Sequence, residues 1–536
     1  MLPRSPSRRA LAGAFATVAL AATAAPAFGA AGDLDPSFGT GGISLDGQPP
    51  SQLESVHARP DGKVVLTGTD PTGDDFWAEQ LTSVGTPDPT FGTAGVVTTD
   101  LLEQSDDGLN ASALQPDGKL LLAGWSSKAN TGSMSLVRYL ADGKLDPSFG
   151  VGGADGDGKV LLPNLQGIQP VGIGSQAQGR IAVVGDVGTG GVIAVYRLDA
   201  HGVPDPEQPD PVKLNPGSGA FPVDASATAD GRILVVAQVE GASVVARLSA
   251  AGGLDTSFGE GGKVSLPEIS QPNDLEVLPD GRMLVAGVAG TGPQARTVVM
   301  RLGAQGGVDR AFGDAGSAVA DFTGDEWAAR AVVQRDGKIL VTAALATEYE
   351  FAAARFTDRG RLDATYRAGG LFTFPVLSLS AVFGAAVTAH DELILAGPAY
   401  KTFPVGKLAT VRLQADPPPV PAGPDGPVGP AGPGPSTPPG DAQAPELTRV
   451  HVLRKAPGTR LRIAFTLSEP ARVHATVRRG HGRLQRFRID ARAGVNRVRV
   501  GRPLRAGRYT LAARAIDTAG NASARHNVHF TASPHR

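Results

Sequence analysis

The 536-residue chain contains no cysteine, only 5% aromatic residues and nine histidines. Without cysteine it has no disulfides, no thiolate metal ligands and no cysteine nucleophile, so its stability must come from packing. It also lacks the G-x-S-x-G motif that positions the nucleophile of many serine hydrolases. Its longest N-terminal apolar run, Leu11–Ala24, is shorter than the roughly 20 residues that a membrane-spanning helix requires. We therefore expect no transmembrane segment.

The sequence is rich in glycine and proline, with 71 and 43 residues respectively. Such a composition favours many short strands joined by turns. The length predicts two or three domains. The net charge is only −2, but residues from Glu446 onward include 20 Lys and Arg against four acidic residues. This asymmetry predicts different partners for the two parts of the chain.

The first 30 residues have the features of a signal peptide. Arg4, Arg8 and Arg9 precede the apolar run, and Ala25-Pro26-Ala27 provides a cleavage cue. We therefore expect an exported protein, secreted and extracellular or associated with the cell wall. Because Ser7–Leu11 partly resembles a twin-arginine signal, both the general and the twin-arginine export routes remain open.

A Leu-Asp-Pro-Ser-Phe-Gly motif recurs along the chain. Successive copies are 53, 58, 109, 54 and 54 residues apart, and the interval of 109 contains a degraded copy. The motif aspartate can accept backbone N–H groups two residues on, and proline fixes φ, so the turn is preset. We expect the aromatic residue to fill the gap between adjacent repeats and to be structural. These aromatic residues are Phe38, Phe91, Phe149, Phe258, Phe312 and Tyr366.

A second landmark is an Asp-Gly turn before an apolar run, as in Pro60-Asp61-Gly62-Lys63. Its seven copies begin about 55 residues apart, a period typical of propellers. Each period contains four strand-like segments, the content of one propeller blade. The seventh period lacks the phenylalanine motif, whereas the motif at Leu34–Gly42 lacks a preceding half-repeat. We therefore predict an all-β fold with a seven-bladed β-propeller at residues 31–414, closed by the N-terminal strand.

The alternation of the two landmarks resembles the delta-60 repeat of bacterial secreted proteins over about residues 34–414. The resemblance implies a β-propeller and no established activity. We expect a disordered Pro/Gly-rich linker at 415–445 and a basic β-sandwich at 446–536. Alternating strands and the placement of Tyr509 make the second domain similar to bacterial Ig-like or fibronectin type III-like domains.

Polar residues precede the Asp-Gly turns and could form a rim at one mouth of the propeller. Trp327 could stack on a sugar or an apolar ligand; ordinary loop solvation and one core tryptophan are the simpler interpretation. The carboxylates in this set also support an alternative, a hydrolase or lyase acting on extracellular glycans. The candidate rim residues are Asp107, Asn110, Asn273, Asp274, Glu326 and Trp327.

The C-terminal arginines could hold phosphate or carboxylate polymers, although base composition explains part of their number. We expect anionic cell-envelope polymers rather than a specific nucleic acid as their partner. The candidate arginines are Arg478, Arg479, Arg483, Arg486, Arg488, Arg497 and Arg499.

The favoured function is a non-enzymatic binding or scaffold protein with no catalytic residues. We expect it to be a monomer that binds a cell-envelope polysaccharide or a surface protein. We expect no cofactor and no metal site. Asp155–Lys159 has the beginning of a calcium loop, but Gln166 stands where the bidentate glutamate belongs, so a surface turn is the simpler interpretation.

Overall fold

The structure is a computed structural model that divides into two compact units, residues 1–419 and 420–536. Residues 1–29 of the expected signal peptide, most of the expected linker, and both Asp155 and Gln166 lie outside the described residues. No described helix is long and apolar enough to cross a membrane. The described residues are 30–129, 131–150, 157–162, 169–186, 192–206, 212–214, 219–322, 326–345, 350–402, 405–417, 445–454, 461–468, 471–479, 484–491, 494–500, 506–516, 523 and 526–532.

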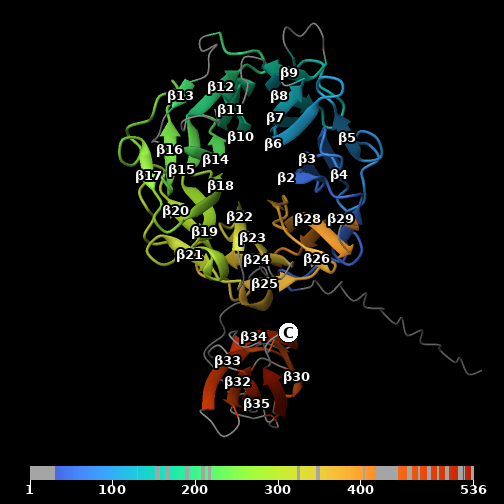
Figure 1. Cartoon of the computed structure of the whole chain (residues 1–536), viewed down its shortest axis with the longest axis vertical. Coiled ribbons are helices and arrows are strands. Elements are labelled where there is room, and N and C mark those ends of the chain that lie inside the picture. The colour runs from blue at the N-terminus through green and yellow to red at the C-terminus, as the bar shows by residue number, and fades with distance from the viewer. Residues whose placement is uncertain are drawn as a thin grey trace, which may run out of the picture. The chain divides into compact units, whose positions relative to one another are not determined.

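The first unit is built from antiparallel sheets arranged in a ring (Figure 1). In all of them except the sheet that contains β1 (Ile43–Asp46), the strand that comes first in the sequence lies toward the centre. Sheet 1 contains β2 (Gln52–Ala58), β3 (Val64–Thr69), β4 (Phe76–Leu81) and β5 (Val96–Thr99). Sheet 2 contains β6 (Asp106–Leu114), β7 (Leu120–Lys128), β8 (Thr131–Tyr139) and β9 (Lys159–Leu162). Sheet 3 contains β10 (Gln169–Ser175), β11 (Ile181–Asp186), β12 (Ile193–Leu198) and β13 (Val212–Leu214).

The next three sheets repeat this order. Sheet 4 contains β14 (Phe221–Ala227), β15 (Ile233–Val239), β16 (Ala242–Leu248) and β17 (Lys263–Ser265). Sheet 5 contains β18 (Gln271–Val277), β19 (Met283–Ala289), β20 (Arg296–Leu302) and β21 (Ser317–Ala320). Sheet 6 contains β22 (Glu326–Val333), β23 (Ile339–Leu345), β24 (Phe351–Phe356) and β25 (Leu371–Phe374). Helical turns in the described chain are the short η2 (Ala177–Gly179), η3 (Gly292–Gln294) and η4 (Arg367–Gly369).

Sheet 7 joins the two ends of the first unit. Strand β1 (Ile43–Asp46) pairs with β29 (Val405–Leu413), and Ile43 lies opposite Val411. The sheet is completed by β28 (Leu393–Thr402), β26 (Leu379–Ser380) and β27 (Gly384–Val387). A segment from the beginning of the described chain therefore occupies a sheet edge that would otherwise be open.

Within each of these sheets, an Asp-Gly turn or a related turn connects the innermost strand to the next strand of the same sheet. At the second turn, Gly118 has a φ of +85°, which favours glycine because it has no Cβ. The side chain of Asp117 accepts the backbone N–H of Lys119 at 3.1 Å. The glycine conformation and the hydrogen bond both stabilise the chain reversal between β6 and β7, so the local sequence is sufficient to specify this turn.

Each motif aromatic residue is almost completely buried and packs between two adjacent sheets. Phe149 lies in a hydrophobic cluster that includes Leu121 from sheet 2 and Ile181 from sheet 3. Phe38 packs in a cluster that includes Val64 from sheet 1 and Ile394 from sheet 7. These contacts connect the sheets around the ring, including at the position where the two ends of the unit meet.

An arginine from the third strand of a sheet completes the phenylalanine motif. We call this arrangement the Arg–Asp–Phe triad. In sheet 2, Nε of Arg138 donates to Oδ2 of Asp146 at 2.7 Å, and its guanidinium carbon lies 4.4 Å from the ring centroid of Phe149. Nη1 of Arg138 donates to the carbonyl of Ala200 in sheet 3 at 2.5 Å. One side chain thus combines an ion pair, a cation–π contact and a link to the next sheet.

The triad recurs around the ring, with Tyr366 replacing phenylalanine once. Its arginine lies eight residues before the motif aspartate except at the ring closure, where the two come from opposite ends of the unit. The other triads are Arg247–Asp255–Phe258, Arg301–Asp309–Phe312, Arg355–Asp363–Tyr366 and Arg412–Asp35–Phe38.

Sheet 1 has a different arrangement, because Gln80 occupies the arginine position. Nε2 of Gln80 donates to Oδ2 of Asp88 at 2.7 Å. Nε of Arg59 donates to Oε1 of Gln80 at 2.6 Å, and its Nη1 donates to the carbonyl of Gly118 in sheet 2 at 2.6 Å. Arg59 therefore provides the guanidinium link to the next sheet.

Ser148 connects both polar members of the triad in sheet 2, and we expect Ser148→Ala to destabilise the protein by about 1 kcal/mol. Its hydroxyl donates to Asp146 at 2.7 Å and accepts from Nη2 of Arg138 at 3.1 Å. Urea unfolding measures the loss, and Ser257→Ala in sheet 4 should give a similar value. Unchanged midpoints in both variants would contradict the prediction.

The second unit consists of two antiparallel sheets around one core. The core includes Phe465 from one sheet and Leu511 from the other. Tyr509 stacks on Phe530 with a centroid distance of 5.3 Å. The first sheet contains β30 (Leu447–Arg454), β31 (Leu461–Leu467) and β34 (Gly494–Val500). The second contains β33 (Leu484–Ala491), β32 (Ala471–Arg479), β35 (Gly507–Ile516) and β36 (His526–Ala532).

Candidate functional site

The innermost strands of sheets 1 to 6 share a break in register after their first residues. In β18 the shift lies between Pro272 and Asp274, and in β14 between Pro222 and Asp224. A β-bulge changes the direction of neighbouring side chains and often accompanies a functional site. The strands that carry these bulges surround the centre of the ring (Figure 1).

Charged residues from four innermost strands form a cluster, which we call the central cluster. Nη1 of Arg330, on β22, lies 3.3 Å from Oδ1 of Asp274 on β18. Its Nη2 lies 3.6 Å from Oε1 of Glu54 on β2. Asp224 on β14 and Glu276 on β18 complete the cluster. Arg330 thus joins sheets that are not neighbours in the ring order.

Two of these carboxylates also bind the backbone of the following sheet. Oδ2 of Asp224 accepts the N–H of Leu275 at 2.8 Å. Oδ2 of Asp274 accepts the N–H of Ala331 at the same distance. These bonds fix the carboxylates close to the bulges and connect β14 to β18 and β18 to β22.

The central cluster holds more negative groups than positive ones, and this imbalance changes its protonation. Burial raises the pKa of Glu276 to about 8, with further contributions from Asp274 and Asp224. Burial also raises the pKa values of Asp224 and Asp274, although the guanidinium of Arg330 opposes the effect. Glu276 is therefore largely protonated at neutral pH, and Asp224 and Asp274 titrate as an interacting pair.

His57 lies on β2 but does not add a positive charge. Burial, followed by the charge of Arg59, lowers the pKa of His57 to about 4. Its Nε2 is 2.8 Å from the hydroxyl of Ser112 on β6. A neutral imidazole is consistent with this hydrogen bond. Among the described residues, Arg330 is therefore the cationic side chain that forms ion pairs with carboxylates of the central cluster.

The structure places all six expected rim residues on innermost strands but does not bring them together. Asn110 and Asn273 each lie at a bulge, and each has a buried Oδ1 without a hydrogen-bond partner among the described residues. Asp274 belongs to the central cluster. Trp327 is 47% exposed, and its ring centroid is 5.4 Å from that of Phe383.

Asp107 and Glu326 are instead buried and bind backbone N–H groups. Oδ2 of Asp107 accepts the N–H of Leu101 at 2.8 Å. Oε1 of Glu326 accepts the N–H of Phe322 at 2.8 Å, and its Oε2 accepts both the N–H and the hydroxyl of Thr297. Their hydrogen bonds hold loops, and the two carboxylates do not share partners with Asp274.

Sequence reasoning missed Glu54, Asp224, Glu276 and Arg330. Each is a charged residue on the first strand of a period, where a half-buried strand normally alternates polar and apolar residues. The useful signal was the recurrence of charge at this strand in several periods. The two cations of the C-terminal set whose side chains are described, Arg478 and Arg479, are exposed on β32. Arg483 lies outside the described residues, as do the side chains of Arg486, Arg488, Arg497 and Arg499.

Two kinds of chemistry suit the central cluster. Several carboxylates around one guanidinium can bind a further cationic group, because each added positive charge relieves repulsion. A protonated Glu276 beside an ionisable aspartate can also supply an acid and a base. Both require access from the centre of the ring, and the side chains of Glu54, Asp274 and Arg330 are 16%, 14% and 34% exposed.

Three segments of the chain, residues 115–149, 228–258 and 278–312, match the sequence model of one protein family. This family is described as a domain of unknown function (DUF5122) beta-propeller. Each matched segment begins near an Asp-Gly turn and ends at a motif phenylalanine, namely Phe149, Phe258 and Phe312. No curated protein matches the chain.

Several solved structures are similar to the chain. The polysaccharide lyase Uly1 is 10% identical, with 68% of this chain and 90% of that chain covered and a TM-score of 0.39. A Dyadobacter fermentans protein of unknown function is 11% identical, with 70% and 98% covered and a TM-score of 0.35. Extracellular domains 1–2 of Drosophila Semaphorin 1b are 10% identical, with 69% and 87% covered and a TM-score of 0.35.

At these identities and TM-scores the structural likenesses carry no argument about activity. The family matches do bear on the fold, because they fall on three separate periods of the same repeat. Together with the antiparallel sheets and the near absence of helix in the described chain, they support a propeller-repeat family.

Proposed function

We propose that the protein is an exported binding protein whose central cluster recognises a ligand bearing amino groups. The observation that carries this proposal is the excess of carboxylates over guanidinium groups in the cluster. An ammonium group could replace the missing positive charge. Trp327, exposed on β22, offers an aromatic surface for a cation or for the face of a sugar. A cell-envelope polysaccharide with free amino groups has both features.

The finer architecture belongs to the same proposal. We take the seven sheets as blades of a seven-bladed delta-60 propeller, and the pairing of β1 with β29 supports closure of the ring. We take the second unit as an Ig-like domain, with two sheets around one core as support. Its exposed Arg478 and Arg479 would contact anionic envelope polymers. Replacing both by alanine in the whole protein, and measuring co-sedimentation with cell envelopes over a salt series, tests this contact.

Calorimetric titration with glucosamine oligosaccharides tests the central cluster. We expect the charged oligomer to bind and its N-acetylated counterpart to bind at least roughly tenfold more weakly, because acetylation removes the ammonium charge. Ionisation of Glu276, with a pKa of about 8, should strengthen binding from pH 6 to pH 9, whereas loss of protons from the sugar amines over the same range should weaken it. A ligand with a permanent charge, a quaternary ammonium oligomer, separates this effect from titration of the amine.

Asp274→Asn is the informative variant, because it removes a charge but keeps a side chain of similar shape. We expect it to weaken binding at least roughly tenfold. Asp321→Asn is the matched control, since this aspartate is half exposed and lies outside the central cluster. Equal affinity of both variants for the charged oligomer would refute the proposed site.

A hydrolase or lyase that acts on extracellular glycans is the second candidate. The observation in its favour is the coexistence of Glu276, which holds a proton at neutral pH, with the ionisable pair Asp224 and Asp274. Incubation with a glycan panel and detection of new reducing ends or unsaturated products tests it, with Glu276→Gln as the inactive control. Binding of a glycan without detectable products would contradict the enzymatic candidate and favour the binding function.

A further inference from the structure

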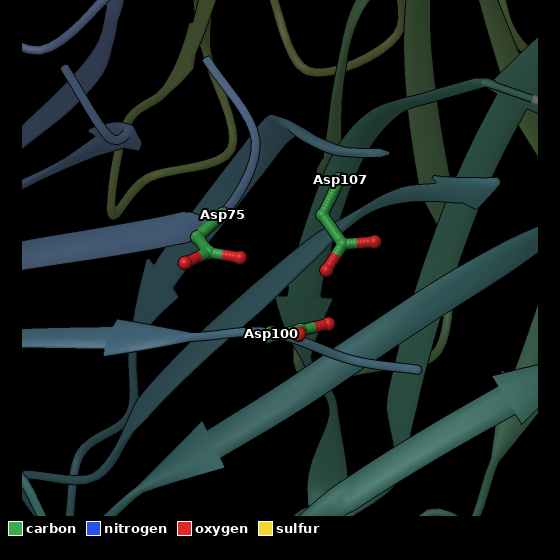
Figure 2. Close-up of side chains that lie close together, drawn as sticks. All are labelled: Asp75, Asp100 and Asp107. Atoms are coloured by element: carbon green, nitrogen blue, oxygen red, sulfur yellow. The ribbon is translucent and has the colours of Figure 1, made fainter. Parts of the chain in front are cut away.

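Three aspartates lie close together between sheets 1 and 2. They are near the beginning of β6, whereas the Asp-Gly turn follows the end of this strand. Asp75 precedes β4, Asp100 follows β5 and Asp107 lies on β6. One carboxylate oxygen from each residue lies within 4.8 Å of the others. Figure 2 shows the three carboxylates facing a common space. An ion bound at roughly 2.3–2.6 Å from each ligand requires oxygens no more than about 5 Å apart, and these meet that condition.

The local backbone holds two of the three carboxylates in place. Asp100 accepts N–H groups from Leu102 and Gln104 and the hydroxyl of Ser105, which closes the loop before β6. Oδ2 of Asp107 accepts the N–H of Leu101. The positions of these side chains are therefore set by the folded loop, as a preformed ligand set requires.

Asp107 provides the observation that distinguishes this group from an ordinary acidic cluster. Its side chain is completely buried, and its Oδ1 accepts no hydrogen bond from the described residues. Burial raises the pKa of Asp107, and the hydroxyls of Ser126 and Ser105 oppose this shift, yet the completely buried hydroxyl of Ser126 has no hydrogen bond of ordinary geometry. Buried carboxylate oxygens are seldom left without a donor or a cation.

The surrounding charges do not neutralise the group. No ion pair joins Asp75, Asp100 or Asp107 to a lysine, arginine or histidine of the described chain. The ammonium group of Lys159 donates to the backbone carbonyl of Asp100 at 2.7 Å, and that of Lys128 donates to the carbonyls of Leu102 and Glu103.

We propose that Asp75, Asp100 and Asp107 bind a hard divalent cation of the calcium class. Carboxylate oxygens are the ligands that calcium prefers, and second carboxylate oxygens and water supply the rest of its coordination shell. The ion would join the β3–β4 loop of sheet 1 to the β5–β6 loop and to β6 of sheet 2. This site is separate from the central cluster, so it does not depend on the proposed function.

Calcium titration of the whole protein after removal of metals with EDTA tests the proposal. We expect the melting temperature to increase with calcium concentration, by several degrees at roughly a hundredfold excess over Kd. Terbium should also bind and emit when tryptophan is excited, because Trp125 packs on Gly108 beside Asp107 and Trp77 lies two residues after Asp75. Calcium should displace terbium and remove the emission.

Asp75→Asn separates a cation site from a structural role, because its carboxylate accepts no hydrogen bond from the described residues. We expect the variant to melt higher than the wild type without calcium, since repulsion is relieved, and to lose at least roughly tenfold in calcium affinity. Asp321→Asn is the matched control, since Asp321 lies outside this group and outside the central cluster, and it should keep the full calcium response. A calcium response that persists in Asp75→Asn, or its absence in the wild type up to 10 mM, would overturn the proposal.

Discussion

Replacing Arg412 by alanine is expected to destabilise the first unit by about 3–5 kcal/mol, because the change leaves a buried carboxylate without its cation. Nε of Arg412 donates to Oδ2 of Asp35 at 2.7 Å, and its Nη1 donates to the carbonyl of Ser83 at 2.6 Å. Its guanidinium carbon lies 4.8 Å from the ring centroid of Phe38. These contacts attach both the N-terminal segment and sheet 1 to the last strand.

The loss of stability caused by Arg412→Ala should depend on pH, because it requires the ionised form of Asp35. Burial opposes ionisation of Asp35, but hydrogen bonds from Ser37 and the charge of Arg412 lower its pKa. The pKa is thus lower in the folded than in the unfolded state, so the stabilisation is complete above roughly pH 4 and is lost as the pH falls through the folded value. Urea unfolding at pH 7 and pH 3 measures this dependence, and the variant should differ less from the wild type at pH 3.

Arg301→Ala is the matched control for ring closure. It removes an equivalent ion pair with Asp309 and a cation–π contact with Phe312, but within sheets that follow one another along the chain. Both variants should lose stability. Only Arg412→Ala should expose the segment around β1 to limited proteolysis under native conditions. Similar proteolysis of the two variants would show that Arg412 does not hold the closure.

The fold is largely encoded in local features of the sequence. The Asp-Gly turns need only glycine at positive φ and an aspartate that caps its own turn, so they can be recognised without knowledge of tertiary contacts. The Arg138–Asp146 ion pair is less evident, because its value depends on the stacking of the guanidinium on Phe149 and on a carbonyl in the next sheet. A constant spacing of eight residues between arginine and aspartate was the signal available in the sequence.

The central cluster was only partly predictable for a physical reason. Asp274 could be named because it precedes an Asp-Gly turn, but Glu54 and Arg330 are 276 residues apart and meet only when the ring closes. Asp107 illustrates the reverse case, since its position before the turn suggested a rim residue. Its surrounding loop instead folds so that a backbone N–H reaches the carboxylate. Local sequence cannot separate these outcomes, because both place a polar residue at the beginning of a strand.

Glu276→Gln is expected to reverse the usual effect of losing a charged residue, stabilising the protein at pH 9. The pKa of Glu276 is raised to about 8 by burial and by Asp274 and Asp224. A carboxyl group with a higher pKa in the folded state binds a proton on folding, so its contribution to stability falls as the pH rises from about 4.3 to 8. Above that range the ionised group costs on the order of 5 kcal/mol. Glutamine does not ionise and avoids this cost.

Urea unfolding at pH 5 and pH 9 tests this reversal. We expect Glu276→Gln to be close to the wild type at pH 5 and more stable at pH 9. Glu268→Gln is the control, since this glutamate is exposed and should change stability by no more than about 0.5 kcal/mol at either pH. Destabilisation by Glu276→Gln at both pH values would mean that the ionised carboxylate stabilises the fold. If the reversal is found, the wild type retains a destabilising charge at the centre of its ring, and a cationic ligand is the partner that would offset it.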